Sequence, residues 1–197
     1  MTEVFNLFPI PVFSTELNYP VDKIETLCQQ ERLKNSKGVI KSNLGGWQSG
    51  DINYPDSPFS FLLDVEKICQ EYAENVLLTD RQLYMANAWI NINQKNNSNI
   101  VHVHPGCVLS GVYYVKTPEE CGNLVLLHPG SDLLTWAWGN FIPESNQSAY
   151  SSPRWWLPAK ANTLYIFPSW LKHSVQPNMS DEERISISFN FSKVVKT

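Results

Sequence analysis

The stretch NIVHVHPGCVLSGVYYV, residues 99–115, places two of the chain's four histidines two positions apart in a strand-like run. Residues i and i+2 of a β-strand point to the same face, so the imidazoles of His102 and His104 can converge on one metal ion. The dipeptide Pro105-Gly106 predicts a turn, and the apolar run after it predicts a second strand. An isolated His-x-His pair is more often structural or exposed, so a metal site needs a third ligand.

His173 is the candidate third ligand, because it follows the strand-like run TLYIF later in the chain. Arg184 then opens the run RISISFNF. An arginine that points into a cavity needs an anionic partner, and no carboxylate is obviously placed to pair with this one. We therefore expect a ligand carboxylate at Arg184.

The run RISISFNF, residues 184–191, alternates polar and apolar side chains with the period of a β-strand. Its polar face has one charge and three small polar groups, including Asn190, and lacks the lysines and glutamates of a typical solvated face. The strand could lie on the surface, but we favour a polar face that lines a cavity and an apolar face under helices. The run WININ, residues 89–93, has the same pattern, with Asn91 on the polar side.

The N-terminal part, residues 1–82, predicts a strand and supporting helices. The start MTEVFNLFPIPVFSTEL has an acidic residue where a signal peptide would be positive, so we interpret it as a strand. Apolar residues at helical spacing predict helices over 20–35 and 57–78, the second with Ser57 as N-cap and Pro58 at the first helical position. Residues 38–53 predict a loop with at most a short strand.

From residue 83 the sequence changes to short strand-like runs separated by turns. One long connection, residues 129–158, is rich in aromatic residues, among them Trp136 and Trp138. These rings either cover a barrel mouth or form a wall for substrate. The pattern predicts a single domain, mainly β with flanking helices, in which a sandwich or open barrel over 83–197 carries helices packed on one outer face.

Composition excludes several classes of function. The chain has 197 residues, 43% hydrophobic and 17% charged, with a net charge of −4 and no basic stripe, which argues against nucleic-acid binding. No apolar run reaches the roughly 18 residues of a membrane span. Its four cysteines have no CxxC or zinc-finger spacing, so we expect reduced thiols in a cytoplasmic protein.

Together, the motifs HPGCVLSGVYYV, LYIFPSWLKHSVQPN and ERISISFNF resemble a bacterial and phage family of 2OG-Fe(II) oxygenases, related to the prolyl hydroxylases. The resemblance covers nearly the whole chain. It implies a double-stranded β-helix core, which is a cupin-like jelly roll. It also implies an Fe(II)- and 2-oxoglutarate-dependent dioxygenase, a hydroxylase that couples decarboxylation of 2-oxoglutarate to succinate with oxidation of a C–H bond by O₂.

The resemblance assigns roles to individual residues. Iron would be held by His102, His104 and His173, whereas His128 is expected to have no metal role. The far carboxylate of 2-oxoglutarate would bind Arg184. The further expected contacts are Ser186, Tyr114 and Asn91 for the cosubstrate, and Trp136, Trp138 and Asn190 for the substrate.

His104 departs from the superfamily, which usually has an aspartate or glutamate at this position. With three neutral imidazoles the Fe(II) site keeps a net charge of about +2 instead of about +1, which favours an anionic chelator and weakens retention of the metal. Three-histidine iron sites exist in other β-barrel dioxygenases, so oxygen chemistry remains compatible with His104.

Three other functions stay open. A cupin-like metalloenzyme would normally have a glutamate soon after His104, and this chain has none there. A zinc hydrolase fits the histidines but gives Arg184 no clear task. A barrel that binds a ligand without turnover is kept open by His104. The expected partners are a small-molecule or peptide substrate and O₂, and a homodimer is also considered.

Overall fold

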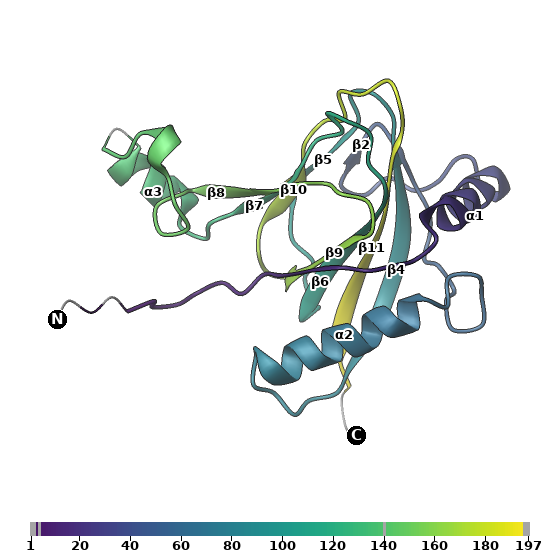
Figure 1. The fold of residues 1–197 in the computed structure, drawn as a ribbon, viewed down its shortest axis with the longest axis horizontal. Coiled ribbons are helices and arrows are strands. Elements are labelled where there is room, and N and C mark those ends of the chain that lie inside the picture. Colours follow the sequence, from purple (N-terminus) through teal and green to yellow (C-terminus); the bar gives the residue numbers. More distant parts are fainter. Residues whose placement is uncertain (1–2, 4, 140, 195–197) are drawn as a thin grey trace.

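The computed structural model describes residues 3, 5–139 and 141–194, and two antiparallel sheets form its body (Figure 1). The larger sheet has the order β1-β9-β6-β11-β4-β3 and contains β1 (Phe13–Glu16), β3 (Trp47–Gln48), β4 (Leu83–Asn93), β6 (Leu109–Lys116), β9 (Thr163–Pro168) and β11 (Arg184–Lys193). The smaller sheet has the order β2-β5-β10-β7-β8 and contains β2 (Asn43–Leu44), β5 (Ser98–His102), β7 (Leu124–Leu127), β8 (Arg154–Leu157) and β10 (His173–Val175).

Two helices share the main hydrophobic core with the larger sheet. Helix α1 (Val21–Lys34) contributes Ile24 and Cys28, and helix α2 (Leu62–Asn75) contributes its buried apolar stripe. They meet the apolar face of β11, where Ile185, Ile187 and Phe189 are fully buried. The opposite face of β11 is thereby left to the space between the sheets.

A second, smaller core cluster lies between the two sheets. It joins Tyr114 of β6 and Phe167 of β9 to Leu124 and Leu126 of β7. This cluster closes one part of the space between the sheets, so the polar residues of β4 and β11 line what remains. No helix in the described part of the chain is long and apolar enough to cross a bilayer.

Several boundaries differ from the sequence-based expectations. Helix α2 begins at Leu62, because residues 57–61 form turns in which Ser57 accepts a hydrogen bond from the amide of Phe59. The N-terminal strand is confined to β1, after Pro9 and Pro11, which have no N–H for a ladder. Strand β10 was not expected, because three residues are too few to show an alternating pattern.

The prediction that residues 129–158 form one long loop is wrong, because much of this segment is regular secondary structure. It contains helix α3 (Ser131–Trp138), a 3₁₀ turn (Glu144–Asn146) and strand β8, which pairs with β7. In Figure 1 this segment stands away from the body at the end of the β7–β8 ribbon.

Candidate metal centre and cosubstrate pocket

Strand pairing brings the three expected histidines together. His102 ends β5 and His173 begins β10, and the two are paired across the ladder. His104 follows β5 by two residues, and its backbone amide donates to the carbonyl of Ser169. One ligand atom from each of the three imidazoles lies within 4.8 Å of the other two. This is the group that the sequence predicted.

Backbone carbonyls orient two of the rings. Nδ1 of His102 is 2.7 Å from the carbonyl oxygen of Ile100, and Nδ1 of His173 is 2.8 Å from that of Leu171. Each Nδ1 therefore donates its proton to a carbonyl, and the Nε2 lone pair is free for a metal. Such outer contacts commonly fix the tautomer of metal-binding histidines.

Burial keeps the imidazoles neutral. Desolvation lowers the pKa of His102, and it lowers the pKa of His104 to about 4 with a further contribution from His102. It lowers the pKa of His173 to about 3, again with a contribution from His102. Neutral imidazole is the form that binds metal, so the site is ready to ligate near neutral pH.

The histidines open onto a cavity between the sheets. From the larger sheet it is lined by Asn91 and Asn93 of β4, Tyr114 of β6, and Ser186 and Ser188 of β11. Tyr114 and Ser186 are direct partners in the ladder between β6 and β11. Three of the four residues expected to contact the cosubstrate, Asn91, Tyr114 and Ser186, thus lie on the wall of the cavity that also holds the histidines, whereas Arg184 is not among its lining residues.

Arg184 is 1% exposed and lies on the same face of β11 as Ser186. Its Nη1 donates to the carbonyls of Cys121 and Gln176, whereas its Nη2 is buried with no hydrogen-bond partner among the described residues. A buried, unpaired guanidinium N–H is costly. A carboxylate of a bound molecule would satisfy it, as the sequence led us to expect.

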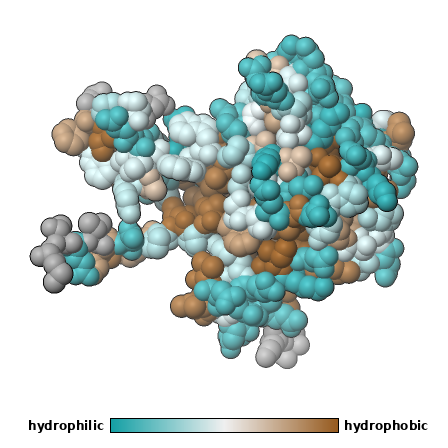
Figure 2. Space-filling view, in the orientation of Figure 1, coloured by the Kyte–Doolittle hydropathy of each residue, from teal (hydrophilic) through white to brown (hydrophobic). Residues whose placement is uncertain are grey.

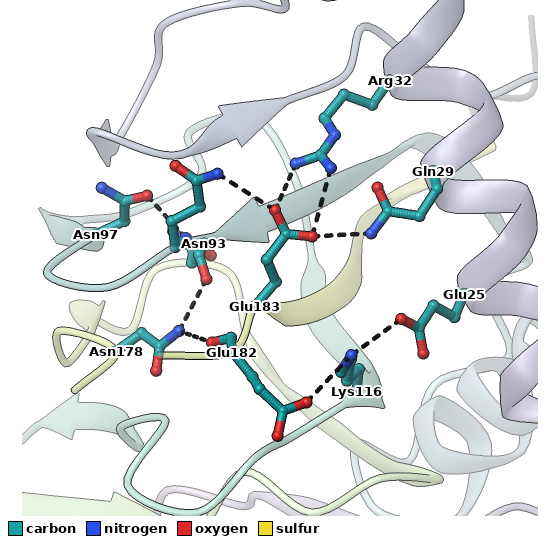
Figure 3. A network of polar contacts seen from close by, with 10 residues as sticks. Glu25, Gln29, Arg32, Asn93, Asn97, Lys116, Asn178, Glu182 and Glu183 are labelled. Carbon is teal, nitrogen blue, oxygen red and sulfur yellow. Dashed lines mark hydrogen bonds and ion pairs between the residues drawn. The ribbon is translucent and has the colours of Figure 1, made fainter. Parts of the chain in front are cut away.

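A polar network fixes the chain just before Arg184 (Figure 3). Glu183 accepts hydrogen bonds from Arg32 and Gln29 of α1, with the Arg32 pair at 2.7 Å. Lys116 at the end of β6 pairs with both Glu25 and Glu182. Helix α1 therefore holds the start of β11 from outside, which positions Arg184 between the sheets.

The residues expected to contact substrate lie elsewhere. Asn190 does not line the cavity, and its amide is satisfied by Ser110 and Asn87. Trp136 and Trp138 belong to α3, beyond the β7–β8 ribbon, and do not line the cavity either. His128 directly follows β7, before a turn, where Nδ1 accepts from the amide of Gly130, outside the histidine group.

The sequence assigned no role to several other lining residues. Asn93 and Asn99 line the cavity, as does Trp89, whose ring packs against His104 with centroids 5.6 Å apart. Gln48 of β3 is the ladder partner of Asn91, and both side chains have a buried amide oxygen without a donor. The alternation in WININ placed Trp89 and Asn93 on the same face as Asn91, whereas two-residue strands such as β3 leave no pattern.

The residues present fit Fe(II) and a dicarboxylate. Imidazole nitrogens suit Fe(II), and the three histidines share one point of convergence. The unpartnered Nη2 of Arg184 supplies a donor for an anion, with Ser186 on the same face of β11.

A family model described as "Putative 2OG-Fe(II) oxygenase" matches residues 87–190. That segment runs from β4 to β11 and includes all three histidines and Arg184. No curated protein matches the chain.

Solved structures resemble the whole fold. A Pseudomonas putida prolyl-4-hydroxylase is 12% identical, with 94% of each chain covered and a TM-score of 0.66. The carbocyclase SnoK from nogalamycin biosynthesis is 15% identical, with 92% of this chain and 79% of that chain covered and a TM-score of 0.66. The collagen prolyl hydroxylase vCPH of Paramecium Bursaria Chlorella virus-1, solved with 2OG, is 12% identical, covers 93% and 96%, and has a TM-score of 0.61. These likenesses confirm the expected jelly-roll core.

Proposed function

Because this chain belongs to the 2OG-Fe(II) oxygenase family, we propose that it hydroxylates a polar substrate, with Fe(II) held by His102, His104 and His173. The reaction consumes 2-oxoglutarate, O₂ and a substrate C–H bond, and it gives succinate, CO₂ and the alcohol. Bound iron would supply the activation of O₂. The convergence of the three imidazoles in the cavity lined by Ser186 is the observation that carries the proposal, and the buried, unpaired Nη2 of Arg184 lies on the same face of β11 as Ser186.

Arg184 binds the far carboxylate of 2-oxoglutarate in this proposal. Its Nη1 donates to two backbone carbonyls, which fix the guanidinium, and Arg184 lies on the same face of β11 as Ser186. Nη2 then donates to the carboxylate. Ser186 and Tyr114, which face each other across the β6–β11 ladder, add hydroxyl donors.

Burial of Tyr114 raises the pKa of its hydroxyl, so that hydroxyl stays protonated and can donate near neutral pH. Asn91 is a further contact at this wall, since its amide nitrogen donates to Ser188 and its oxygen has no donor.

The cavity wall suggests the chemistry of the substrate. Its polar lining consists of amides, hydroxyls and imidazoles, with no carboxylate or ammonium group among the lining residues. A neutral polar group, such as the amide of a peptide or of a small metabolite, would be recognised by Asn93 and Asn99 near His102. We further place the protein in the cytoplasm, a proposal supported by its four free cysteines, three of them buried.

The test is anaerobic purification, measurement of bound metal, and then measurement of succinate after addition of Fe(II), 2-oxoglutarate and O₂. Slow succinate formation without substrate, and faster formation with a peptide or metabolite that is hydroxylated, are the expected results. Binding of metal and 2-oxoglutarate without any succinate would instead indicate a binding barrel, the alternative that His104 keeps open. Absence of 2-oxoglutarate binding would overturn the proposal.

A further inference from the structure

The segment 129–157, named here the aromatic arm, exposes large apolar side chains away from the cavity. Trp136 is 86% exposed and Phe141 is 81% exposed, and neither lines the cavity. Figure 2 shows apolar residues on the arm and at its junction with the body. The other exposed large side chains of the arm are Leu133, Trp138, Tyr150 and Trp155.

The exposed area matches what a stable protein interface requires. A fully buried aromatic side chain covers about 150–250 Å², so these six side chains together expose on the order of 800 Å². A standard interface buries about 800 Å² on each partner. The arm alone therefore carries enough apolar surface for one specific interface.

The N-terminal segment adds to this surface. Phe5, Leu7 and Phe8 are all largely exposed, with Phe8 at 93%. In Figure 1 this segment extends from the body on the same side as the arm. Residues 5–13 have no charged side chain, and Asn6 is the only polar one, so the segment contributes mainly apolar surface.

The charge of the arm favours a protein partner over a membrane surface. Between residues 129 and 157 the sequence has two acidic residues, Asp132 and Glu144, and a single basic one, Arg154. Helices that bind membrane surfaces have lysines and arginines on their polar face, and α3 has none. Few charges together with many aromatic residues are typical of the centre of a protein interface.

The strand at the base of the arm can pair with a copy of itself. Strand β8 is an edge strand of the smaller sheet, since among the described strands it pairs with β7 alone. Exposed edges are usually protected by charges or by a covering segment, and β8 has only Arg154 and an exposed Trp155. Two antiparallel edge strands related by a twofold axis present the same groups to each other, so such an interface closes after two chains.

From these observations we propose that the aromatic arm is the interface of a homodimer, in which β8 and α3 of one chain pack against the same elements of a second copy. The interface lies outside the cavity, so this inference is independent of the proposed reaction.

The experiment is light scattering after size exclusion on the full chain, over concentrations from about 1 to about 100 µM. The wild type should have twice the monomer mass of 22.5 kDa. The double variant Trp136→Ser/Phe141→Ser should be monomeric, with a dimer dissociation constant raised at least roughly thirtyfold. The matched control Ile40→Ser/Leu78→Ser replaces side chains that are 88% and 84% exposed outside the arm, and it should stay dimeric.

A second measurement uses only the wild type. Amide hydrogen exchange of residues 154–157 should slow as the concentration rises through the dimer transition, because pairing protects the edge of β8. A monomeric wild type overturns the proposal, and if that monomer binds phosphatidylglycerol vesicles, the arm is a membrane contact instead. If Trp136→Ser/Phe141→Ser is still a dimer and amide exchange in β8 does not change with concentration, the dimer interface lies elsewhere.

Discussion

Nε2 of His104 lies 3.2 Å from Nε2 of His173, which is 69 positions away in the chain. Two nitrogens bound at right angles to one ion, each at about 2.1 Å, are about 3.0 Å apart, so this pair already has the separation of adjacent ligands. Because Nδ1 of His173 donates to Leu171, its Nε2 accepts the proton of His104 when no metal is bound. A metal ion must replace that hydrogen bond, and both rings then act as ligands.

Replacement of His173 tests this geometry. His173→Ala should lower the affinity for Co(II), used as a redox-stable probe, by more than roughly hundredfold, because it removes a ligand and the carbonyl contact that orients it. Calorimetric titration of the metal-free protein measures the change. His128→Ala is the control, because His128 lies outside the histidine group, and it should bind the metal as the wild type does. Equal binding by both variants would show that the metal lies elsewhere.

Replacement of Arg184 separates the cosubstrate from the metal. Arg184→Lys keeps the positive charge but loses the planar pair of donors, so we expect 2-oxoglutarate to bind roughly ten- to hundredfold more weakly. The affinity of Arg184→Lys for Co(II) in the absence of 2-oxoglutarate should stay within about threefold of the wild-type value, which is a small change in binding free energy. The control is Arg81→Lys, the same substitution at an exposed arginine outside the network around β11. An unchanged affinity for 2-oxoglutarate in Arg184→Lys would place the carboxylate elsewhere.

A glycine beside the cavity tests the packing of the larger sheet. A Cβ at Gly111 would lie 2.4 Å from the ring of Phe189 and 2.5 Å from the carbonyl of Tyr165. Gly111→Ala should therefore lower the free energy of unfolding by about 1–3 kcal/mol, as overpacking does. Gly50→Ala, where a Cβ meets nothing within 4 Å, should change it little. Urea unfolding measures both, and equal effects would contradict this packing.

The sequence predicted the histidine group because strand spacing and the family resemblance both pointed to it. The period of two in RISISFNF predicted the cavity face of β11, and the i, i+2 spacing of His102 and His104, with His173 after a later strand, predicted the group that could bind a metal. The sequence could not indicate Gln48, because β3 has two residues and its position depends on pairing with β4.

The aromatic residues of the arm show the opposite limit. Their number indicated a functional surface, but an exposed aromatic side chain and one that lines a cavity look alike in a sequence. Which one occurs depends on the path of the β7–β8 ribbon, and this ribbon carries Trp136 away from the cavity. The same argument applies to Asn190, whose amide is satisfied by Ser110 and Asn87.

The lowered histidine pKa values predict how stability depends on pH. In the folded state burial holds the pKa of His173 at about 3 and that of His104 at about 4, whereas in the unfolded chain each is about 6.5. Between these values the unfolded state binds more protons, so the metal-free protein loses stability as pH falls below about 6.5, by up to about 1.4 kcal/mol per pH unit for each group. Urea unfolding of wild type and His173→Gln should show a shallower slope for the variant, and equal slopes would contradict the assignment.

The histidine in the usual place of a carboxylate predicts a strong coupling between metal and cosubstrate. The cavity has no carboxylate among its lining residues, so 2-oxoglutarate would be the main anion that compensates both the metal and Arg184. In the wild type, 2-oxoglutarate should therefore tighten Co(II) binding at least roughly tenfold, and Co(II) should tighten 2-oxoglutarate binding by the same factor. In His104→Asp the carboxylate ligand removes part of that charge, so Co(II) should bind more tightly alone and the coupling factor should fall.

The control for His104→Asp must add the same charge to the cavity without adding a ligand. Asn93→Asp does this, because Asn93 lines the cavity but lies outside the histidine group. If His104 is a ligand, only His104→Asp should combine tighter Co(II) binding with a reduced coupling factor, whereas Asn93→Asp should weaken 2-oxoglutarate binding by repulsion. Co(II) titrations with and without 2-oxoglutarate give all of these values. The same change in both variants would mean that position 104 acts through its charge alone, and the metal would then be held by His102 and His173 without it.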